Sequence, residues 1–485
     1  MSRHDVIIIG GGLSGASALH RLAREGANVI LLERRTSLGG VARSRRNAQG
    51  ALVESGPNSA QSGTPELAAL VEDLHLADKI VRPGEAAANR YIMRDGALVV
   101  APTTPREFLR TALFNRRTRL RALRERFVAP APADREESVA QFVERRLGRD
   151  VLEYAVDPFI SGIYAGRPEH LSLRHAFPGL HSLEQTHGSL IRGALRMQRQ
   201  RSKERRRAAK EGRSATAPER GIFSFTEGMG MLPQTIQEYW HDLLRLGCAV
   251  ERMERQGSLW SVQAGGDTYT ARDLIVATEA DTAASLLAPI QPELGDVLRT
   301  IEHPPLAVAT MLYGRSAVEH PLDGFGLLIP SSEHRRILGV IFSSTLFPGR
   351  APEGTVLLTA FTGGARDPHR TAVSDEELLY EVHGELRRIL GIGSKPLSSD
   401  LQRWPRSIPQ YNLGYQRVLD AIAAAEECLP GLHLLGSYRG GVSVGDRVKA
   451  GWQLAERLLA SGIIPPVTAN SNRPECGTEN IAEME

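Results

Sequence analysis

The sequence predicts an α/β protein of several domains, and three features of the chain support this prediction. At residues 5–24 an apolar run, a glycine-rich turn and an apolar-periodic segment follow one another in the order strand, turn, helix. Between residues 305 and 361, short alternating runs are typical of an antiparallel sheet. At 485 residues the chain is too long for one ordinary core, so two or three domains are expected.

The amino-terminal turn predicts a dinucleotide site. A strand at residues 6–9 runs into Gly10, Gly11, Gly12, Leu13, Ser14 and Gly15. In such a site the first glycine turns tightly, Gly12 lets the backbone approach a pyrophosphate, and Gly15 lets the helix pack on the strand. A second apolar run ends in Glu33, 18 residues after Gly15, where a carboxylate accepts hydrogen bonds from a ribose. The alternative is a turn in which the glycines have only a steric role.

A second glycine turn follows this acid and indicates which dinucleotide is bound. Residues 38–43 read LGGVAR and place Gly40, Val41 and Arg43 just after Glu33. A nicotinamide site does not need this turn. The arrangement resembles the glutathione-reductase-type flavoproteins, which include the amine oxidases and in which this loop lies along FAD. FAD is therefore the expected cofactor.

The composition is that of a soluble globular protein, with 41% hydrophobic and 24% charged residues. The three cysteines, Cys248, Cys428 and Cys476, are odd in number and widely spaced, which favours a reducing compartment and argues against a disulfide framework or a zinc site. No apolar run approaches the roughly 18 residues needed to span a bilayer, and no signal peptide is evident. A cytoplasmic location is expected. Peripheral contact with the inner face of the cell membrane and assembly as a homodimer are two further options that the sequence leaves open.

Two basic runs stand out against the net charge of +3. In residues 106–126, apolar side chains alternate with arginines, which favours an amphipathic helix at a membrane surface. For residues 192–220 the preferred interpretation is a solvated insertion. Contact with a membrane is the second alternative, and contact with nucleic acid is the least favoured. No nucleic-acid partner is expected.

The remaining elements are predicted from periodicity and turn signals. Helices are expected at residues 65–76, 139–147, 234–246, 375–390 and 447–460, and a glycine-punctuated turn is expected at 157–166. Strands are expected in a hairpin at 89–98 and at 249–253, 260–264, 273–278, 305–313, 326–329, 338–343, 355–361 and 432–435. The four strands between 305 and 361 are predicted to continue the hairpin at Tyr91 as an antiparallel sheet covered by the helix at 375–390.

These elements predict a three-part fold. A discontinuous Rossmann-like FAD-binding domain of the glutathione-reductase type takes residues 1–86, 221–300 and 404–464. An antiparallel-sheet substrate domain takes 87–104 and 301–403, and a helical domain takes 105–220, including the basic insertion at 192–220. The tail at 465–485 is expected to be disordered.

Ten short strings, in order along the chain, resemble the protoporphyrinogen oxidase family. They include GGGLSG, LGGVARS, ESGPNS, NRYIMRDG, DPFISGIYAG and GSYRGGVSVGD, and the likeness extends from Val6 to about Leu459. The arginine-rich insertion near residues 199–213 departs from that pattern. The resemblance implies a six-electron oxidation of protoporphyrinogen IX to protoporphyrin IX in haem biosynthesis, with FAD as carrier, O2 as acceptor and hydrogen peroxide as product.

The resemblance also implies a substrate site. Its members would be Arg90, Gly162, Phe325, Leu328, Leu338, Ile341 and Phe342. Arg90 would hold a propionate at the rim, Gly162 would bring backbone close to the macrocycle, and the apolar side chains would form a slot. The chemistry requires little of side chains, and no acid or base is assigned. No metal is expected, because the histidines at 170–187 are irregularly spaced and lack cysteine partners.

Further FAD contacts are implied in the same way. They are Arg34, Val41, Gly56, Pro57, Asn58 and Ser59 along the ribityl and pyrophosphate region, Val250 near the adenine, and Trp404 with Val442, Ser443 and Val444 beside the flavin ring. Gly436 ends a predicted strand before a helix whose amino terminus suits an anion or the ring.

Three other functions remain open from the sequence. The first is oxidation of coproporphyrinogen III, whose four propionates would require more cationic residues at the rim of the site than the single matched arginine. An amine oxidase or carotenoid desaturase would share only the cofactor motifs. A non-catalytic FAD scaffold or nucleic-acid binder, built around the arginine run, is the most distant.

Overall fold

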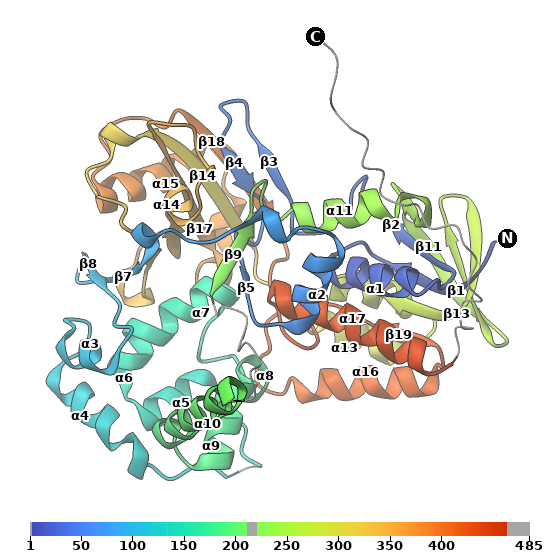
Figure 1. Cartoon of the computed structure of the whole chain (residues 1–485), viewed down its shortest axis with the longest axis horizontal. Helices are drawn as coiled ribbons and strands as arrows, with labels where there is room; N and C mark the ends of the chain where they lie inside the picture. Colours follow the sequence, from blue (N-terminus) through green and yellow to red (C-terminus); the bar gives the residue numbers. More distant parts are fainter. Residues whose placement is uncertain (1, 133, 211–220, 463–485) are drawn as a thin grey trace.

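The computed structural model describes residues 2–132, 134–210 and 221–462 (Figure 1). The predicted disordered tail and the end of the basic insertion, residues 211–220, lie outside the described residues. None of the described helices combines the length and the apolar character that a bilayer crossing requires.

The first sheet gathers strands from three distant parts of the chain. Its order is β10-β2-β1-β13-β12-β11, and β19 also pairs with β13. The strands are β1 (Ser2–Ile9), β2 (Val29–Glu33), β10 (Leu244–Leu246), β11 (Val250–Gln256), β12 (Leu259–Ala264), β13 (Asp267–Val276) and β19 (Leu432–Leu434). Because β1 runs parallel to both β2 and β13, the turn after β1 lies at the carboxyl edge in the middle of the sheet.

Helices cover both faces of this sheet, as its sequence pattern requires. Val6 and Ile8 face a core shared with α1 (Leu13–Arg24), α2 (Pro65–Asp73), α11 (Met231–Tyr239) and α17 (Val444–Ala460). Ile7 and Ile9 face the core shared with α12 (Ala280–Leu287), α13 (Pro292–Arg299) and α16 (Gln416–Cys428). A strand that is buried on both faces has apolar residues at every position, which explains the continuous apolar run at residues 6–9.

The second sheet has the order β18-β14-β17-β16-β15-β7-β8. Its strands are β7 (Asn89–Arg94), β8 (Ala97–Val100), β14 (Leu306–Gly314), β15 (Gly324–Leu328), β16 (Gly339–Ile341), β17 (Thr355–Gly363) and β18 (Ser398–Trp404). The sheet continues the hairpin as predicted, but the joining pair β15 and β7 is parallel, whereas the sequence predicted antiparallel pairing throughout. The predicted helix α15 (Asp375–Leu390) packs on one face.

The segment between the hairpin and residue 210 is helical (Figure 1). It contains α3 (Pro105–Arg110), α4 (Arg116–Arg124), α5 (Val139–Arg146), α6 (Arg149–Val151), α7 (Asp157–Tyr164), α8 (Leu173–Ala176), α9 (Pro178–His187) and α10 (Leu190–Lys210). A buried ion cluster holds these helices together: Arg146 pairs with Glu125 and, at 2.5 Å, with Glu184.

Three sequence predictions are wrong in this part and nearby. Within the turn predicted at 157–166, residues 157–164 form helix α7, since Pro158 sits in its first turn and Ala165, at φ 49°, ends it. Residues 106–126 form two short helices, not one, because Leu113 and Phe114 between them are buried in the core. The helix predicted at 234–246 stops at Tyr239, and residues 244–246 pair with β2 at the sheet edge.

Two small sheets complete the fold. One joins β3 (Ser44–Arg46) to β4 (Leu52–Glu54), and the other joins β5 (Ala60–Gln61), β9 (Ile222–Phe225) and β6 (Ile80–Val81). The domain boundaries given above remain a prediction.

Candidate active site

The glycine turn after β1 is shaped by two close approaches and one open position. A Cβ on Gly10, at φ 106°, would lie 2.7 Å from the carbonyl oxygen of Ala277, and one on Gly15 would lie 2.0 Å from that of Gly10. A Cβ on Gly12 would meet no atom within 4 Å. Gly10 and Gly15 are therefore required by packing, whereas Gly12 borders open space where a ligand can approach the amino terminus of α1.

Glu33 is oriented by two backbone groups. The Gly11 N–H donates to Oε2 at 2.6 Å, and the Arg35 N–H donates to Oε1 at 2.8 Å. Its carbonyl accepts from the Cys248 N–H at 2.9 Å, which brings the start of β11, and with it Val250, to the same end of the site. The carboxylate keeps acceptor capacity that suits the hydroxyls of a ribose.

The second glycine turn lies directly against the first. The Gly39 N–H donates to the Gly11 carbonyl at 2.8 Å, and a Cβ on Gly40 would lie 3.4 Å from the Cα of Gly12. Val41 is 45% exposed, although it belongs to a tightly packed loop, and a Cβ on Gly56 would lie 2.5 Å from its carbonyl oxygen. An exposed valine directly after the second glycine turn is a surface that a bound group would cover.

Two arginines lie near the Trp404 ring here, and one of them, together with a nearby serine, has a buried polar atom that no described residue satisfies. The guanidinium groups of Arg35 and Arg43 lie 6.0 and 5.8 Å from the ring centre of Trp404. Burial and the charge of Arg35 lower the pKa of Arg43. Arg43 Nε and Ser14 Oγ are buried, and neither has a hydrogen-bond partner among the described residues. A diphosphate would supply the missing acceptors and the missing negative charge, so these residues fit the FAD that the sequence predicts.

The other predicted cofactor residues lie in two loops around these turns. Pro57, Asn58 and Ser59 are partly buried after Gly56, and Trp404 Nε1 donates to the Ser55 carbonyl at 2.8 Å. Arg34 points to solvent, whereas Arg35 donates to the Gly40 carbonyl at 2.8 Å. Sequence reasoning missed Arg35, because two adjacent arginines after a strand cannot be told apart by pattern.

The loop between β19 and α17, residues 435–443, also lies near the amino-terminal glycine turn, because α17 packs against α1. Gly436 follows β19, and Ser443 caps α17 with its hydroxyl while Asp446 completes a capping box. Val442 is partly buried and Val444 is buried. A Cβ on Gly451 in the middle of α17 would lie 2.0 Å from the Ser14 carbonyl oxygen, so the first turn of α1 packs directly against α17.

The predicted substrate residues divide between the two faces of the second sheet. Arg90, Phe325, Leu328 and Ile341 are partly or fully exposed on the face away from α15. A bulge in β15 at Phe325 places its ring 5.5 Å from the Arg90 guanidinium. Gly162 on α7 faces Leu328, since a Cβ there would lie 3.0 Å from Leu328 Cδ2. Five of the seven residues are thus brought to one face.

The other two predicted residues are in the core. Phe342 has no exposed surface and packs against Tyr91 and His320 on the α15 side of the sheet. Leu338 is buried with Ala165 and Leu306. Adjacent strand residues point to opposite faces of a sheet, so Ile341 and Phe342 cannot line one slot. Leu338, just before β16, lies on the side of Ala165 but is covered there.

Two apolar residues of this face were missed in the sequence. Phe159 and Ile163 of α7 are 48% and 38% exposed and lie on the same helix face as Gly162. Their spacing of three and four residues is the signal of a shared helical face, and it was overlooked because the two glycines favoured a turn.

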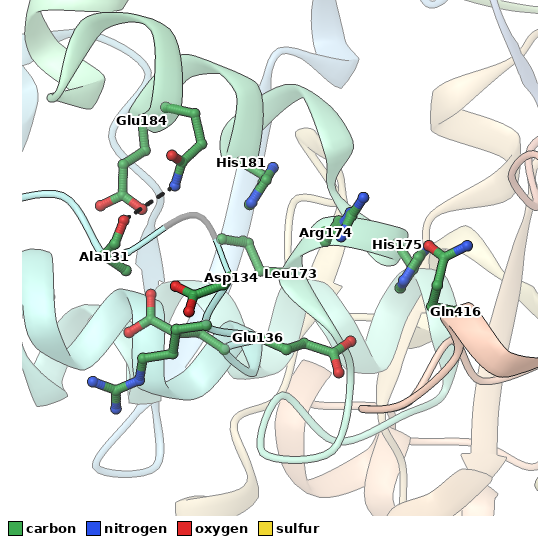
Figure 2. A pocket seen from close by; sticks show the side chains of 12 residues that line it. Ala131, Asp134, Glu136, Leu173, Arg174, His175, His181, Glu184 and Gln416 are labelled. Atoms are coloured by element: carbon green, nitrogen blue, oxygen red, sulfur yellow. Dashed lines mark hydrogen bonds between the residues drawn. The ribbon is translucent and has the colours of Figure 1, made fainter.

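A polar cavity of about 190 Å³ lies elsewhere, in the helical segment (Figure 2). Glu136, His175 and His181 line it, but two of its carboxylates, those of Glu136 and Glu184, are already engaged. Glu184 bonds to Arg145 and Arg146, and Glu136 accepts from Ser172 and Gly414. Among the residues that the structure describes, no group of histidines, cysteines and carboxylates could hold a metal ion.

Comparison with known proteins decides the family. Residues 11–459 match the flavin-containing amine oxidoreductases. The chain belongs to this family. It is 32% identical over 482 residues to protoporphyrinogen oxidase 2, chloroplastic/mitochondrial, of Arabidopsis thaliana, covering 95% of this chain and 94% of that protein. It is 29% identical over 471 residues to coproporphyrinogen III oxidase of Bacillus subtilis, covering 93% and 96%.

Solved structures show the same fold. A candidate protoporphyrinogen oxidase from Exiguobacterium sp. 255-15 has a TM-score of 0.77 at 23% identity and covers 95% of this chain and 99% of that one. Cyclohexylamine oxidase from Brevibacterium oxydans has a TM-score of 0.68 at 16% identity and covers 94% and 99%. The family match and the relatives make the protein an FAD-dependent oxidoreductase. Because an amine oxidase shares its fold, the fold alone does not choose the substrate.

Proposed function

We propose that the enzyme oxidises protoporphyrinogen IX to protoporphyrin IX in haem biosynthesis, with O2 as electron acceptor and hydrogen peroxide as product. The observation that supports this best is the sheet face described above, where Arg90 stands at the rim of an apolar surface facing α7. A porphyrinogen has the same distribution of chemistry, a broad apolar macrocycle with carboxylate arms. The full-length likeness to proteins named protoporphyrinogen oxidase points the same way.

The residues of this face have distinct parts in such a reaction. The Arg90 guanidinium offers parallel donors to a propionate, and Phe325 supports it from below. Leu328 and Ile341 on the sheet and Phe159 on α7 cover the pyrrole rings and exclude water. Gly162 lets the macrocycle approach closely because it has no side chain.

When bound, FAD accepts a hydride from the substrate and passes the electrons to O2, so three cycles consume three O2 and release three H2O2. Growing conjugation drives the hydride loss, and the macrocycle releases one proton to water for each hydride, so no residue is assigned as acid or base. The protein contributes by position: Arg90 holds a propionate at one end, the apolar side chains hold the macrocycle at the other, and the reacting carbon is thereby aligned with the flavin.

Coproporphyrinogen III is the competing substrate, in view of the Bacillus relative. Purified FAD-loaded protein would be mixed anaerobically with each porphyrinogen, and flavin bleaching followed before air is admitted. Faster bleaching by protoporphyrinogen, followed by porphyrin fluorescence, supports the proposal. Faster bleaching by coproporphyrinogen assigns the other substrate, and bleaching by neither contradicts both.

We also propose that the protein is cytoplasmic and touches the membrane peripherally through α3, α4 and the turn after them. Leu109, Leu120, Leu123 and Phe127 are exposed there, with Phe127 at 70%. The same segment carries Arg116, Arg117, Arg121, Arg124 and Arg126. Exposed apolar side chains among arginines suit an anionic bilayer surface.

Sedimentation with phosphatidylglycerol vesicles tests this contact. Phe127→Glu is expected to lose binding, because a carboxylate would enter the headgroup region. The matched control is Tyr380→Glu on α15, since Tyr380 is also an exposed aromatic residue, at 77%. Equal binding by both variants would contradict the proposed surface. Light scattering of the same samples reports whether the protein is a homodimer, which stays a prediction.

A further inference from the structure

The loop between β19 and α17 has an unusual hydrogen-bonding pattern. Four consecutive carbonyls, those of residues 436–439, each accept a bond from a buried side chain. Arg447 donates to Gly436 and, at 2.6 Å, to Arg439. The Tyr411 hydroxyl donates to Ser437 at 2.5 Å, and the Tyr415 hydroxyl donates to Tyr438 at 2.7 Å.

These side chains come from outside the loop and are fixed themselves. Tyr411 and Tyr415 belong to the segment before α16 and are 3% and 5% exposed, and Arg447 lies in the first turns of α17. Tyr411 makes a second contact, because its oxygen accepts from the Gly441 N–H at 3.1 Å. One phenol therefore joins two points of the loop that are four residues apart.

Fixing the carbonyls also fixes the amide groups. In a trans peptide the C=O and the following N–H point in opposite directions. The N–H groups of Ser437, Tyr438 and Gly440 therefore lie on the side away from the tyrosines and Arg447. Within the described part of the chain, none of these three N–H groups has an acceptor. Tyr438 is a buried residue, and an unpaired donor in a buried position calls for an acceptor that a ligand can supply.

The geometry points to Tyr411, Tyr415 and Arg447 as positioning residues that turn this loop's N–H groups toward the flavin and so raise its reduction potential. This inference rests on the proposed placement of FAD against residues 436–444. Reduced flavin is richer in electrons than oxidised flavin, so N–H dipoles stabilise it and carbonyl dipoles would oppose it. The inference therefore concerns the potential of the cofactor, beyond the identity of the substrate.

The decisive variant is Tyr411→Phe, which keeps the ring and removes both loop contacts. The Ser437 carbonyl then loses its donor, and its peptide is free to rotate toward the cofactor. We expect at least a tenfold shift of the flavin equilibrium toward the oxidised form, about 30 mV for a two-electron couple. Tyr415→Phe removes one contact and should shift the potential in the same direction by less.

The control is Tyr313→Phe. Tyr313 is equally buried, with its hydroxyl 2.9 Å from His383 Nδ1, but it lies under α15 in the second sheet. Potentials are measured by anaerobic dye titration of FAD-loaded protein, with the FAD dissociation constant recorded beside them. A Tyr411→Phe potential equal to that of wild type and Tyr313→Phe would overturn the inference.

The same titration separates this inference from the proposed function. If wild type binds FAD and Tyr411→Phe shifts the potential while neither porphyrinogen bleaches the flavin, only the proposed substrate fails. If Tyr411→Phe does not fold, Tyr415→Phe decides, since it leaves the Gly441 contact in place. An unchanged potential in that variant also counts against the inference.

Discussion

Arg366 and Asp157 are 209 residues apart in sequence, yet Arg366 NH2 lies 3.2 Å from Asp157 Oδ2. The same guanidinium donates to Ser161 Oγ at 2.8 Å and to the Ile329 carbonyl at 2.9 Å. Asp157 also accepts from the Ser331 N–H at 2.6 Å. This mostly buried pair fastens α7, and with it Gly162, to the end of β15 just beyond Leu328.

Arg366→Met should therefore loosen the substrate face as well as the fold. It leaves Asp157 with a charge that has lost its partner, so we expect the free energy of unfolding to fall by about 1.5 to 3 kcal/mol. KM should rise more than kcat falls, because the spacing of α7 and β15 governs binding. Denaturant unfolding and steady-state kinetics check both. Arg299→Met, which breaks an exposed pair with Asp296, should cost at most about 1 kcal/mol and leave KM unchanged.

The sequence was enough to predict the parts of the fold that repeat a local pattern. The strand of residues 6–9, its glycine turn and the helix at 375–390 follow from periodicity and were found. The parallel pairing of β15 with β7 was not, because the register of two strands more than 200 residues apart leaves no local signal. The bulge that brings Phe325 under Arg90 is hidden for the same reason.

The candidate site shows the same division. Glycines can be assigned from sequence because they are needed where atoms approach closely, as at Gly10 and Gly15. Phe342 could not be separated from Ile341, because which face of a strand is open depends on where α15 packs. The Arg366–Asp157 pair had no signature, since charged residues at a distance are paired only by the fold.

The guanidinium of Arg90 gives a second prediction. Arg90→Lys keeps the charge but loses the parallel donors, so KM for a porphyrinogen should rise roughly 10- to 100-fold, as expected for a charge-assisted contact of about 1.5 to 3 kcal/mol. Phe325→Leu removes the ring beneath and should raise KM only about 2- to 5-fold, because an exposed cation–π contact contributes about 0.5 to 1 kcal/mol.

The control for this pair is Arg126→Lys, since Arg126 also lies over a ring, that of Phe127, at 4.7 Å, but outside the candidate site. Its KM in detergent solution should match wild type. The prediction concerns carboxylate binding, so a porphyrinogen with esterified propionates should show no difference between wild type and Arg90→Lys. A difference that persists with the ester would assign Arg90 a different role.

His20 predicts how stability depends on pH. The ring is buried between α1, α2 and α11, with Nδ1 accepting from Trp240 Nε1 at 3.1 Å and Nε2 lying 3.3 Å from Asp73. Protonation would place a second hydrogen on Nδ1, against the indole N–H. Burial, followed by the charges of Arg24 and Arg21, lowers the pKa of His20 from 6.5 to about 4.

In the unfolded chain His20 is therefore protonated below about pH 6.5, whereas in the folded chain it is protonated only below about pH 4. Between these values the free energy of unfolding should fall with falling pH, by at most about 3 kcal/mol from this group. His20→Gln can keep both contacts without titrating and should flatten the curve in this range. His241→Gln, at an exposed histidine, should leave it unchanged. Urea unfolding at half-unit pH steps makes the comparison.

The unpaired arginine at the two glycine turns predicts how the apoprotein responds to anions. Arg43 Nε and Ser14 Oγ have no partner in the part of the chain that the structure describes, so pyrophosphate alone should raise the melting temperature of the apoprotein, and Arg43→Met should abolish that rise. The same variant should weaken FAD binding about 10- to 100-fold, because one charge-assisted contact contributes about 1.5 to 3 kcal/mol. Arg34→Met is the matched control, because its guanidinium points to solvent. If Arg34→Met weakened FAD binding as much as Arg43→Met, the diphosphate would lie outside the two turns, and Arg34, as the sequence implied, would be its partner.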